Sequence, residues 1–238
     1  MSQNLDNPIN ILLEQILGSK EGDDRDLCVI YLRSTCQKHL FAEKRLKSLR
    51  KRIAEYKRNR RVKQYDTFTV TTWPVTLYIE MDFDHCVLSL RSSLDHLAQL
   101  INAIIPLKLS SRVTRGETHV TLKNVIGEIR KNNLLKNNEC LSNLSSCLNS
   151  EMEKDWYRDL HDLRITMFHD KFDRFTRTSL ETFERQLLDL KFLLPSGTAK
   201  SLVTEEERDI TSYCESVIRK VEAVLKKTFD VLSKYLSK

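Results

Sequence analysis

The chain has 238 residues, a formal net charge of +6, and only five glycines and four prolines, a composition that favours long helices and few tight turns. It holds no run of eighteen apolar residues, and its N-terminus lacks a basic region followed by an apolar one, so we expect neither a membrane span nor a secretory signal. The six cysteines form no CxxC pair and are expected to be free thiols of a cytoplasmic protein.

The first half of the chain predicts a short helix followed by two long ones. The short helix covers 8–17 and belongs to an N-terminal appendage, residues 1–22. Apolar residues at a spacing of about 3.6 then predict a long helix over 24–62. A second long helix is expected over 73–105, because Pro74 is tolerated in the first turn of a helix.

The second half predicts a modest helix over 119–132 and then, over 136–150, a loop that contains a helical turn, because Asn and Ser are frequent there. A third long helix follows over 150–172, and a short strand or hairpin is expected near 185–194. A Thr-Glu-Glu-Glu capping box opens the last helix, over 204–236. The sequence therefore predicts one all-α domain over residues 1–238, an up-and-down bundle of four long helices with shorter ones added.

The basic character is concentrated in residues 44–63, KRLKSLRKRIAEYKRNRRVK, which hold eleven Lys or Arg and one Glu. The apolar stripe of the first long helix thins after Ile53, so residues 44–65 are expected to project past the core. Such a run is commonly a solvated helix face, but it is also typical of a phosphate-binding arm. In the second interpretation the nucleic-acid-binding residues are Arg58, Arg60, Arg61 and Lys63.

The centre of the second long helix, DFDHCVLSLRSSLDHLAQLINAII, gathers polar residues in an apolar stretch. Arg91 and Asp95 are four positions apart and can form an ion pair along the helix. The ordinary interpretation is an ion pair at a seam of the bundle with His96 half-buried beside it, and the alternative is a functional role for Asp95 or His96. A metal-binding bundle using Asp82, His85 and His96 is a weaker hypothesis, since no second Asp/Glu-x-x-His motif completes a dinuclear centre.

The segment WYRDLHDLRITMFHD, residues 156–170, places Arg and His beside an apolar helix face. Arg164 and His169 are five positions apart, so their side chains diverge by about 140° on a straight helix. They converge only if the helix bends or if a second chain supplies one of them. His161 and Arg164 are the better neighbours within one helix.

The segments RSSLDHLAQLIN (91–102) and DLRITMFHDKF (162–172) together resemble the HEPN superfamily, in particular bacterial HEPN-like proteins. An Arg followed a few residues later by a His on a late helix of a small all-α bundle marks this family. Many members are metal-independent ribonucleases of toxin, antiphage or RNA-processing systems. The resemblance implies that the chain binds RNA, needs no cofactor and forms a homodimer, with an antitoxin or nucleotidyltransferase as a further partner.

The resemblance also assigns Arg164 and His169 as the catalytic residues. RNA carries its own nucleophile, the 2′-hydroxyl. His169 would take the proton of that hydroxyl or protonate the leaving 5′-oxygen, while Arg164 would bind the phosphate, and the product ends would be 2′,3′-cyclic phosphates. Two such motifs would face each other across the dimer. The supporting residues would be Asp95, His96, Arg91 and His161.

Ile165 departs from the pattern of the catalytic members, which usually place a polar residue directly after the Arg. Many HEPN domains are non-catalytic. A non-catalytic RNA- or protein-binding module therefore stays open as an alternative function for this chain.

Overall fold

The computed structural model describes residues 3–62, 73–105, 107, 109, 120–169 and 209–237. Within these ranges the protein is an all-α helical bundle of eight helices with no strand, which confirms the predicted fold class. None of the described helices is both long and apolar enough to cross a membrane. In chain order the helices are α1 (Gln3–Ser19), α2 (Gly22–Val62), α3 (Trp73–Ile104), α4 (Leu122–Lys131), α5 (Asn133–Lys136), α6 (Glu139–Met152), α7 (Asp155–His169) and α8 (Ile210–Leu236).

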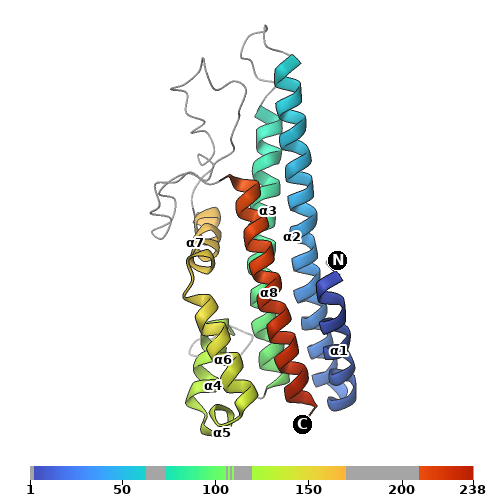
Figure 1. The fold of residues 1–238 in the computed structure, drawn as a ribbon, viewed down its shortest axis with the longest axis vertical. Helices are drawn as coiled ribbons and strands as arrows, with labels where there is room; N and C mark the ends of the chain where they lie inside the picture. Colours follow the sequence, from blue (N-terminus) through green and yellow to red (C-terminus); the bar gives the residue numbers. More distant parts are fainter. Residues whose placement is uncertain are drawn as a thin grey trace.

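The three longest helices, α2, α3 and α8, form the frame of the bundle (Figure 1). α2 and α3 lie side by side in opposite directions, α8 packs against both, and α1 packs against α2 and α8. Burial follows the helical period because each helix turns one apolar stripe inward. The fully enclosed side chains include Leu49, Phe83, Leu90, Leu97 and Phe229.

The first helix is longer than predicted and contributes to the same core. α1 begins at Gln3, so Pro8 lies inside the helix rather than at its start. Leu12 and Ile16 are fully buried, which joins the predicted N-terminal appendage to the rest of the bundle. Gly22 opens α2 with a φ of 54°, a left-handed conformation that glycine adopts without steric cost.

The loop predicted over 136–150 is wrong, because most of this stretch forms helix α6. Asn138 caps that helix by accepting a hydrogen bond from the backbone N–H of Leu141 at 3.3 Å. Leu141, Leu144 and Leu148 are buried along one face of the helix. The cap and the apolar stripe thus outweigh the low helix propensity of the many Asn and Ser residues.

α7 carries the predicted catalytic segment and is a separate, shorter helix than the one predicted over 150–172. α6 ends at Met152, and α7 begins only at Asp155. Trp156, Leu160 and Leu163 are buried, and α7 packs against α3. This packing holds one face of α7 beside the middle of α3.

The last helix has the predicted period but a later start. Asp209 is its N-cap and accepts a hydrogen bond from the backbone N–H of Ser212 at 2.9 Å. Val217, Val221 and Phe229 are buried at the predicted spacing. The strand or hairpin predicted near 185–194 and the expected capping box at 204–207 lie outside the described residues.

Candidate functional site

The contact between α3 and α7 brings together four of the residues that the sequence singles out: Arg91, Asp95, His161 and Arg164. Arg91 and Asp95 are one helical turn apart on α3. The Nη2 atom of Arg91 lies 3.3 Å from Oδ1 of Asp95, which confirms the predicted pair. The Nη1 atom of Arg164 lies 3.3 Å from the other carboxylate oxygen of Asp95. One carboxylate of α3 therefore bridges two guanidinium groups.

Arg91 is the buried member of this cluster. Its side chain is only 7% exposed, and its guanidinium carbon lies 5.2 Å from the centre of the Tyr157 ring. Its Nε and Nη1 atoms have no hydrogen-bond partner among the described residues. A buried polar group without a partner typically costs about 1–3 kcal/mol, and more if it is charged. Arg91 thus holds two buried N–H groups that no described residue satisfies.

Arg164 is the exposed member, since 40% of its side chain is accessible to solvent. Asp95 orients this guanidinium group, as only one of its nitrogens is used in the ion pair. The two arginines and the aspartate carry a net charge of +1. The cluster is therefore a partly desolvated cationic site with one arginine that a ligand can reach.

His161 lies in the electrostatic field of this cluster. Burial lowers the pKa of His161 below its ordinary value, and the nearby cationic Arg91 lowers it further. Arg164 acts in the same direction, while the carboxylates of Asp162 and Asp95 oppose the shift. The imidazole is therefore mainly neutral at pH 7 and can accept a proton.

His96 follows Asp95 in sequence but is influenced by a different helix. Burial lowers the pKa of His96 as well, and the second contribution comes from Lys38 of α2, with Asp95 opposing it. The electrostatic environment of His96 thus includes α2 as well as Asp95. The sequence predicted it as a supporting residue, and the structure places it at the edge of the site.

His169 is the last residue of α7, and its side chain lies outside the described part of the chain. α7 continues without interruption from Asp155 to His169. Five positions on a continuous helix correspond to about 500° of rotation, so the backbone positions 164 and 169 lie about 140° apart around the axis of α7. Within one chain, His161 is therefore the histidine that shares a face with Arg164.

The basic segment 44–63 is only partly free of acidic partners. Arg45 and Arg52 contact Asp82 of α3, at 3.1 and 2.6 Å. Arg50 pairs with Glu215 of α8 at 2.5 Å. These arginines attach α2 to its neighbours, a role that the sequence analysis missed.

Other cations of the segment point to solvent. Lys44, Lys47 and Arg58 are exposed, and no acidic group of the described residues pairs with them. Arg60 and Arg61 belong to α2, but their side chains lie outside the described part of the structure, as does Lys63 altogether. Of the four predicted nucleic-acid-binding residues, the structure thus places Arg58 alone, on an exposed face. The upper ends of α2 and α3 extend beyond the start of α8 (Figure 1).

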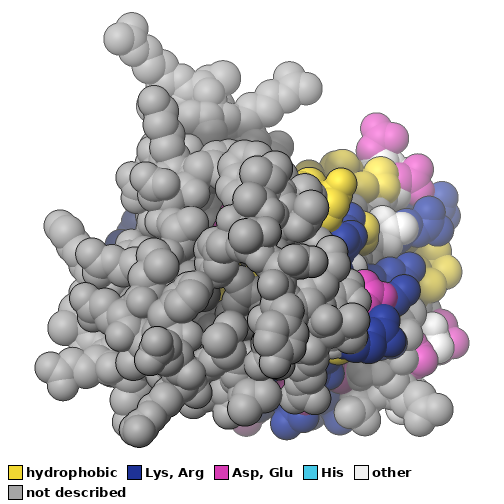
Figure 2. Space-filling model, turned by 90° about the horizontal axis from the view of Figure 1, so that it is seen from above, with side chains coloured by type: hydrophobic (Ala, Val, Ile, Leu, Met, Phe, Trp, Pro, Cys, Tyr) yellow, Lys and Arg dark blue, Asp and Glu magenta, His cyan; other side chains and the backbone are white. Residues whose placement is uncertain are grey.

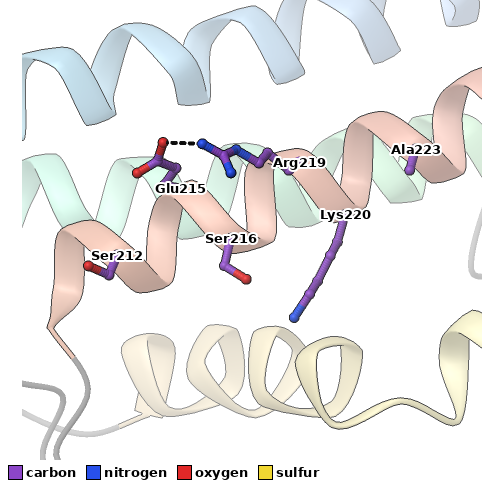
Figure 3. A pocket seen from close by; sticks show the side chains of 6 residues that line it. All are labelled: Ser212, Glu215, Ser216, Arg219, Lys220 and Ala223. Atoms are coloured by element: carbon purple, nitrogen blue, oxygen red, sulfur yellow. Dashed lines mark hydrogen bonds and ion pairs between the residues drawn. The ribbon is translucent and has the colours of Figure 1, made fainter.

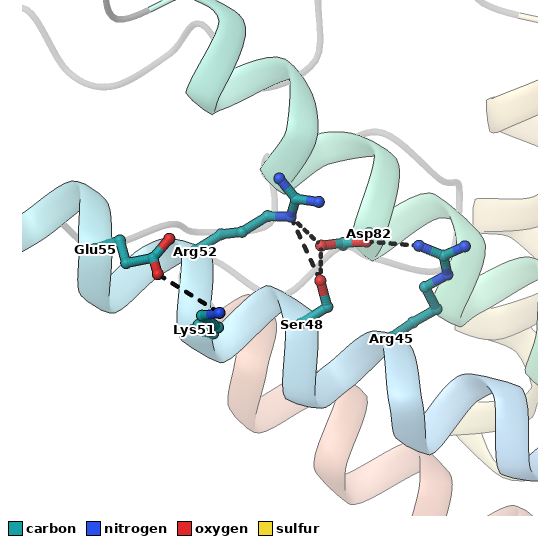
Figure 4. A network of polar contacts seen from close by, with 6 residues as sticks. All are labelled: Arg45, Ser48, Lys51, Arg52, Glu55 and Asp82. Carbon is teal, nitrogen blue, oxygen red and sulfur yellow. Dashed lines mark hydrogen bonds and ion pairs between the residues drawn. The ribbon is translucent and has the colours of Figure 1, made fainter.

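The residues of the metal hypothesis are not arranged as ligands in the described structure. Both carboxylate oxygens of Asp82 are engaged, one by Arg45 and the other by Ser48 and Arg52 (Figure 4). In the described ranges, no three His, Cys, Asp or Glu side chains are grouped closely enough to hold a metal ion. The weaker hypothesis of a metal-binding bundle thus finds no support in the positions of Asp82, His85 and His96.

A shallow cavity of about 380 Å³ on α8 offers less chemistry than the α3–α7 cluster. Ser216 and Lys220 point from α8 toward the helices of the α6–α7 region (Figure 3). Glu215, the one acid in its lining, is bound by Arg219 at 2.6 Å and also by Arg50. The one acid of the lining is therefore already paired with two arginines.

Comparisons with known proteins do not supply a family for this geometry. No protein-family model matches the chain. No curated protein and no solved structure matches it either.

Proposed function

We propose that this protein binds RNA at the α3–α7 contact and cleaves it without a metal ion, as an endoribonuclease of the HEPN type. The observation that supports this proposal is the bridge formed by Asp95, which holds the exposed Arg164 next to the buried Arg91 and close to a neutral His161. Phosphodiester cleavage in RNA needs a cation at the phosphate and a group that moves protons. The cluster supplies both kinds of group.

The chemistry follows from these groups. The histidine takes the proton of the 2′-hydroxyl, whose oxygen attacks the adjacent phosphorus. The bond to the 5′-oxygen breaks, and that oxygen takes the proton from the protonated histidine as it leaves. Arg164 donates hydrogen bonds to the phosphate oxygens as negative charge grows in the transition state. The products carry a 2′,3′-cyclic phosphate and a 5′-hydroxyl.

Two histidines are candidates for the proton transfer. His161 serves in a site formed by one chain, because it shares a face with Arg164. His169 serves in a site shared by two chains, as the family resemblance implies, because a symmetric homodimer can bring His169 of one protomer to Arg164 of the other. The two arrangements predict different behaviour of mixed variants.

The exposed basic side of α2 is proposed to bind the RNA backbone beyond the cleavage site. Figure 2 shows Lys and Arg side chains in dark blue along the described side of the molecule, with some acidic side chains between them. Lys44, Lys47 and Arg58 are exposed members of this surface, and Arg60, Arg61 and Lys63 continue it in sequence. Such contacts add affinity that depends on salt and carry little sequence preference.

A cytoplasmic toxin or antiphage role fits this activity. A ribonuclease in that role would need a partner that restrains its cleavage of RNA. The six cysteines are free, as expected in a reducing compartment. An antitoxin or a nucleotidyltransferase that covers or modifies the site would be such a partner.

A second candidate function is a non-catalytic module that binds RNA. Two observations favour it: α7 is unbroken between Arg164 and His169, and Ile165 offers no polar group beside Arg164. In this function Arg91 and Arg164 bind a phosphate, but no proton is transferred.

A cleavage assay with four proteins separates these functions. The wild type is incubated with a labelled single-stranded RNA in the presence of a chelator, beside Arg164→Ala, His161→Ala and His169→Ala. We expect wild-type cleavage to persist in chelator and Arg164→Ala to lower its rate by about 10²–10³. A 2′-deoxy nucleotide at the scissile position should block the reaction. Binding without any cleavage by the wild type would establish the non-catalytic module instead.

Mixing the inactive variants identifies the histidine. If the site is shared by two chains, a mixture of Arg164→Ala and His169→Ala regains activity, because the mixed dimer holds one intact Arg–His pair. If His161 is the proton acceptor, His161→Ala is inactive while His169→Ala cleaves normally. Arg164→Lys is the matched control, because it keeps the positive charge but loses the bidentate geometry of the guanidinium group.

A further inference from the structure

The face formed by α2 and α3 carries two exposed aromatic rings, each in contact with an arginine. Phe41 is 42% exposed, and the guanidinium carbon of Arg45 lies 4.7 Å from the centre of its ring. Tyr78 is 47% exposed, and the guanidinium carbon of Arg52 lies 4.8 Å from its ring centre. We call these two ring–arginine pairs the platform.

Asp82 of α3 holds both arginines of the platform in place. Its carboxylate is buried and accepts hydrogen bonds from Arg45 Nη1, Ser48 Oγ and Arg52 Nε (Figure 4). In this view each arginine is joined to Asp82 through a single nitrogen. Each arginine thus uses one nitrogen to hold its place and keeps others for a ligand.

An anchoring role for Asp82 explains why Arg45 and Arg52 lie at this position, but it does not explain why each is covered by an exposed aromatic ring. An ion pair between α2 and α3 stabilises the hairpin whether or not an aromatic ring covers each guanidinium group. A ring that served packing alone would gain more by being buried, since stabilisation grows with the apolar area removed from water. Phe41 and Tyr78 instead leave more than two fifths of their surface open.

The charge around the platform indicates the kind of ligand. Lys44 and Lys51 are exposed on α2, within three positions of Phe41 and one position of Arg52 in sequence, respectively. The acids on this part of α2 are Glu43, which lies 3.9 Å from His39, and Glu55, which lies 3.9 Å from Lys51. A ligand that matches both features has planar apolar groups attached to a chain of negative charges. Single-stranded RNA has this structure, because its unpaired bases can stack on aromatic rings and on guanidinium planes.

We propose that the platform binds single-stranded RNA, with one base stacking on Phe41 and another on Tyr78, while Arg45 and Arg52 contact the flanking phosphates. Seven positions separate the two arginines, a rise of about 10 Å along α2, so the pairs serve different nucleotides. This inference deepens the proposed function, because it names unpaired RNA as the form of the substrate. It uses a different face of α3 from the one that contacts α7.

The test measures binding of a fluorescein-labelled oligouridine by fluorescence anisotropy. Phe41→Ala and Tyr78→Ala should each weaken binding by about 5- to 100-fold, the effect of losing one stacked base. Tyr78→Phe is the matched control, which keeps the ring and should bind like the wild type. Both rings are largely exposed, so the circular dichroism spectrum should not change.

Three further results decide the proposal. A duplex RNA of the same length should compete poorly, because its bases are not available for stacking. Equal competition by the duplex, or by polyglutamate, would show a surface that attracts any polyanion and would overturn the proposal. The proposal would also be overturned if Phe41→Ala and Tyr78→Ala both bound the oligouridine with wild-type affinity.

The same proteins separate this inference from the proposed function. If Phe41→Ala and Tyr78→Ala bind RNA weakly but cleave it normally at saturating protein, both proposals stand. If these variants lose binding while Arg164→Ala still cleaves, the platform stands and the ribonuclease assignment of Arg164 fails. If Arg164→Ala loses cleavage but the ring variants bind normally, the platform is wrong and the proposed function remains.

Discussion

Helix α3 carries two aspartates that each bridge two arginines, and the two bridges differ in how completely they are satisfied. Asp82 has a side chain that is 2% exposed, and three donors from α2 engage both of its oxygens. Asp95 is 35% exposed and leaves Arg91 with two unpaired buried nitrogens. The closed network of the Asp82 carboxylate is fully satisfied and stabilises the fold, whereas the open network of the Asp95 bridge leaves buried arginine donors unsatisfied. The comparison distinguishes the Asp82 bridge, which anchors α2 to α3, from the Asp95 bridge, which belongs to the candidate site between α3 and α7.

The largest effect is expected from breaking the closed network. Asp82→Asn removes the charge that holds Arg45 and Arg52, and it should lower the free energy of unfolding by about 2–4 kcal/mol. Urea denaturation followed by circular dichroism measures this loss. Asp95→Asn is the matched variant and should cost less than Asp82→Asn, because Asp95 and its partner Arg164 are partly exposed whereas Asp82 is buried. Equal losses in the two variants would contradict the distinction between the two bridges.

The open network should respond in activity rather than in stability. Asp95→Asn frees Arg164 from its bridge, so the guanidinium group is no longer held in one orientation. We expect RNA cleavage to fall by about 10-fold or more, because a misplaced catalytic group loses much of its contribution. Single-turnover kinetics at saturating protein provide the measurement, with Asp82→Asn as the comparison. A normal cleavage rate in Asp95→Asn would remove this carboxylate from the site.

A smaller effect concerns the titration of His161. Burial lowers its pKa first and Arg91 second, so Arg91→Met should raise the pKa of His161 toward its ordinary value. NMR titration of the imidazole resonances reports the change directly. Arg45→Met, on the Asp82 side, is the control and should leave the pKa of His161 where it is.

The same shift predicts a sign for the pH dependence of stability. A histidine with a lowered pKa in the folded state binds its proton less readily than it does in the unfolded chain. Stability is therefore full above the unfolded pKa of about 6.5 and decreases as the pH falls from there toward the folded value. His161→Leu should reduce this loss, as measured by thermal unfolding at a series of pH values. An identical pH profile in the variant would indicate that His161 titrates normally.

The smallest effect belongs to the exposed basic residues. Replacing Arg58, Arg60, Arg61 and Lys63 together with glutamine should weaken RNA binding and reduce the salt slope by about 0.7 for each lost contact to a single strand. Stability should hardly change, since isolated exposed charges contribute little. An unchanged slope would return this segment to the interpretation of a solvated helix face.

Much of the fold could be predicted because three helices bury a regular apolar stripe. The period of Val217, Val221 and Phe229 is visible in the sequence and is buried as expected. The missed helix α6 depends on the cap at Asn138, which looks like a loop residue unless the leucines that follow are weighed with it. Helix propensity of single residues was the weaker guide in this segment.

The candidate site was predictable only within single helices. The spacing of Arg91 and Asp95 indicates their ion pair directly, because residues four apart are neighbours on a helix. The bridge from Asp95 to Arg164 depends on which turn of α7 meets α3, and the sequence does not specify that alignment. Asp82 was considered as a metal ligand because Asp82 and His85 lie three positions apart on one helix, whereas its partners Arg45 and Arg52 belong to another helix. An acid facing a basic stretch of a neighbouring helix was the signal that could have identified this anchor.

The position of α8 has a consequence for how the protein is made. α8 packs against both α2 and α3, yet its first residue, Ile210, is 106 positions after Ile104 at the end of α3. At a synthesis rate of about 5–20 residues per second, the ribosome needs roughly 5–20 seconds to add the intervening chain. During that time the apolar residues of α2 and α3 that pack against α8 remain uncovered. The nascent hairpin is therefore the stage at which chaperones have the most apolar surface to bind.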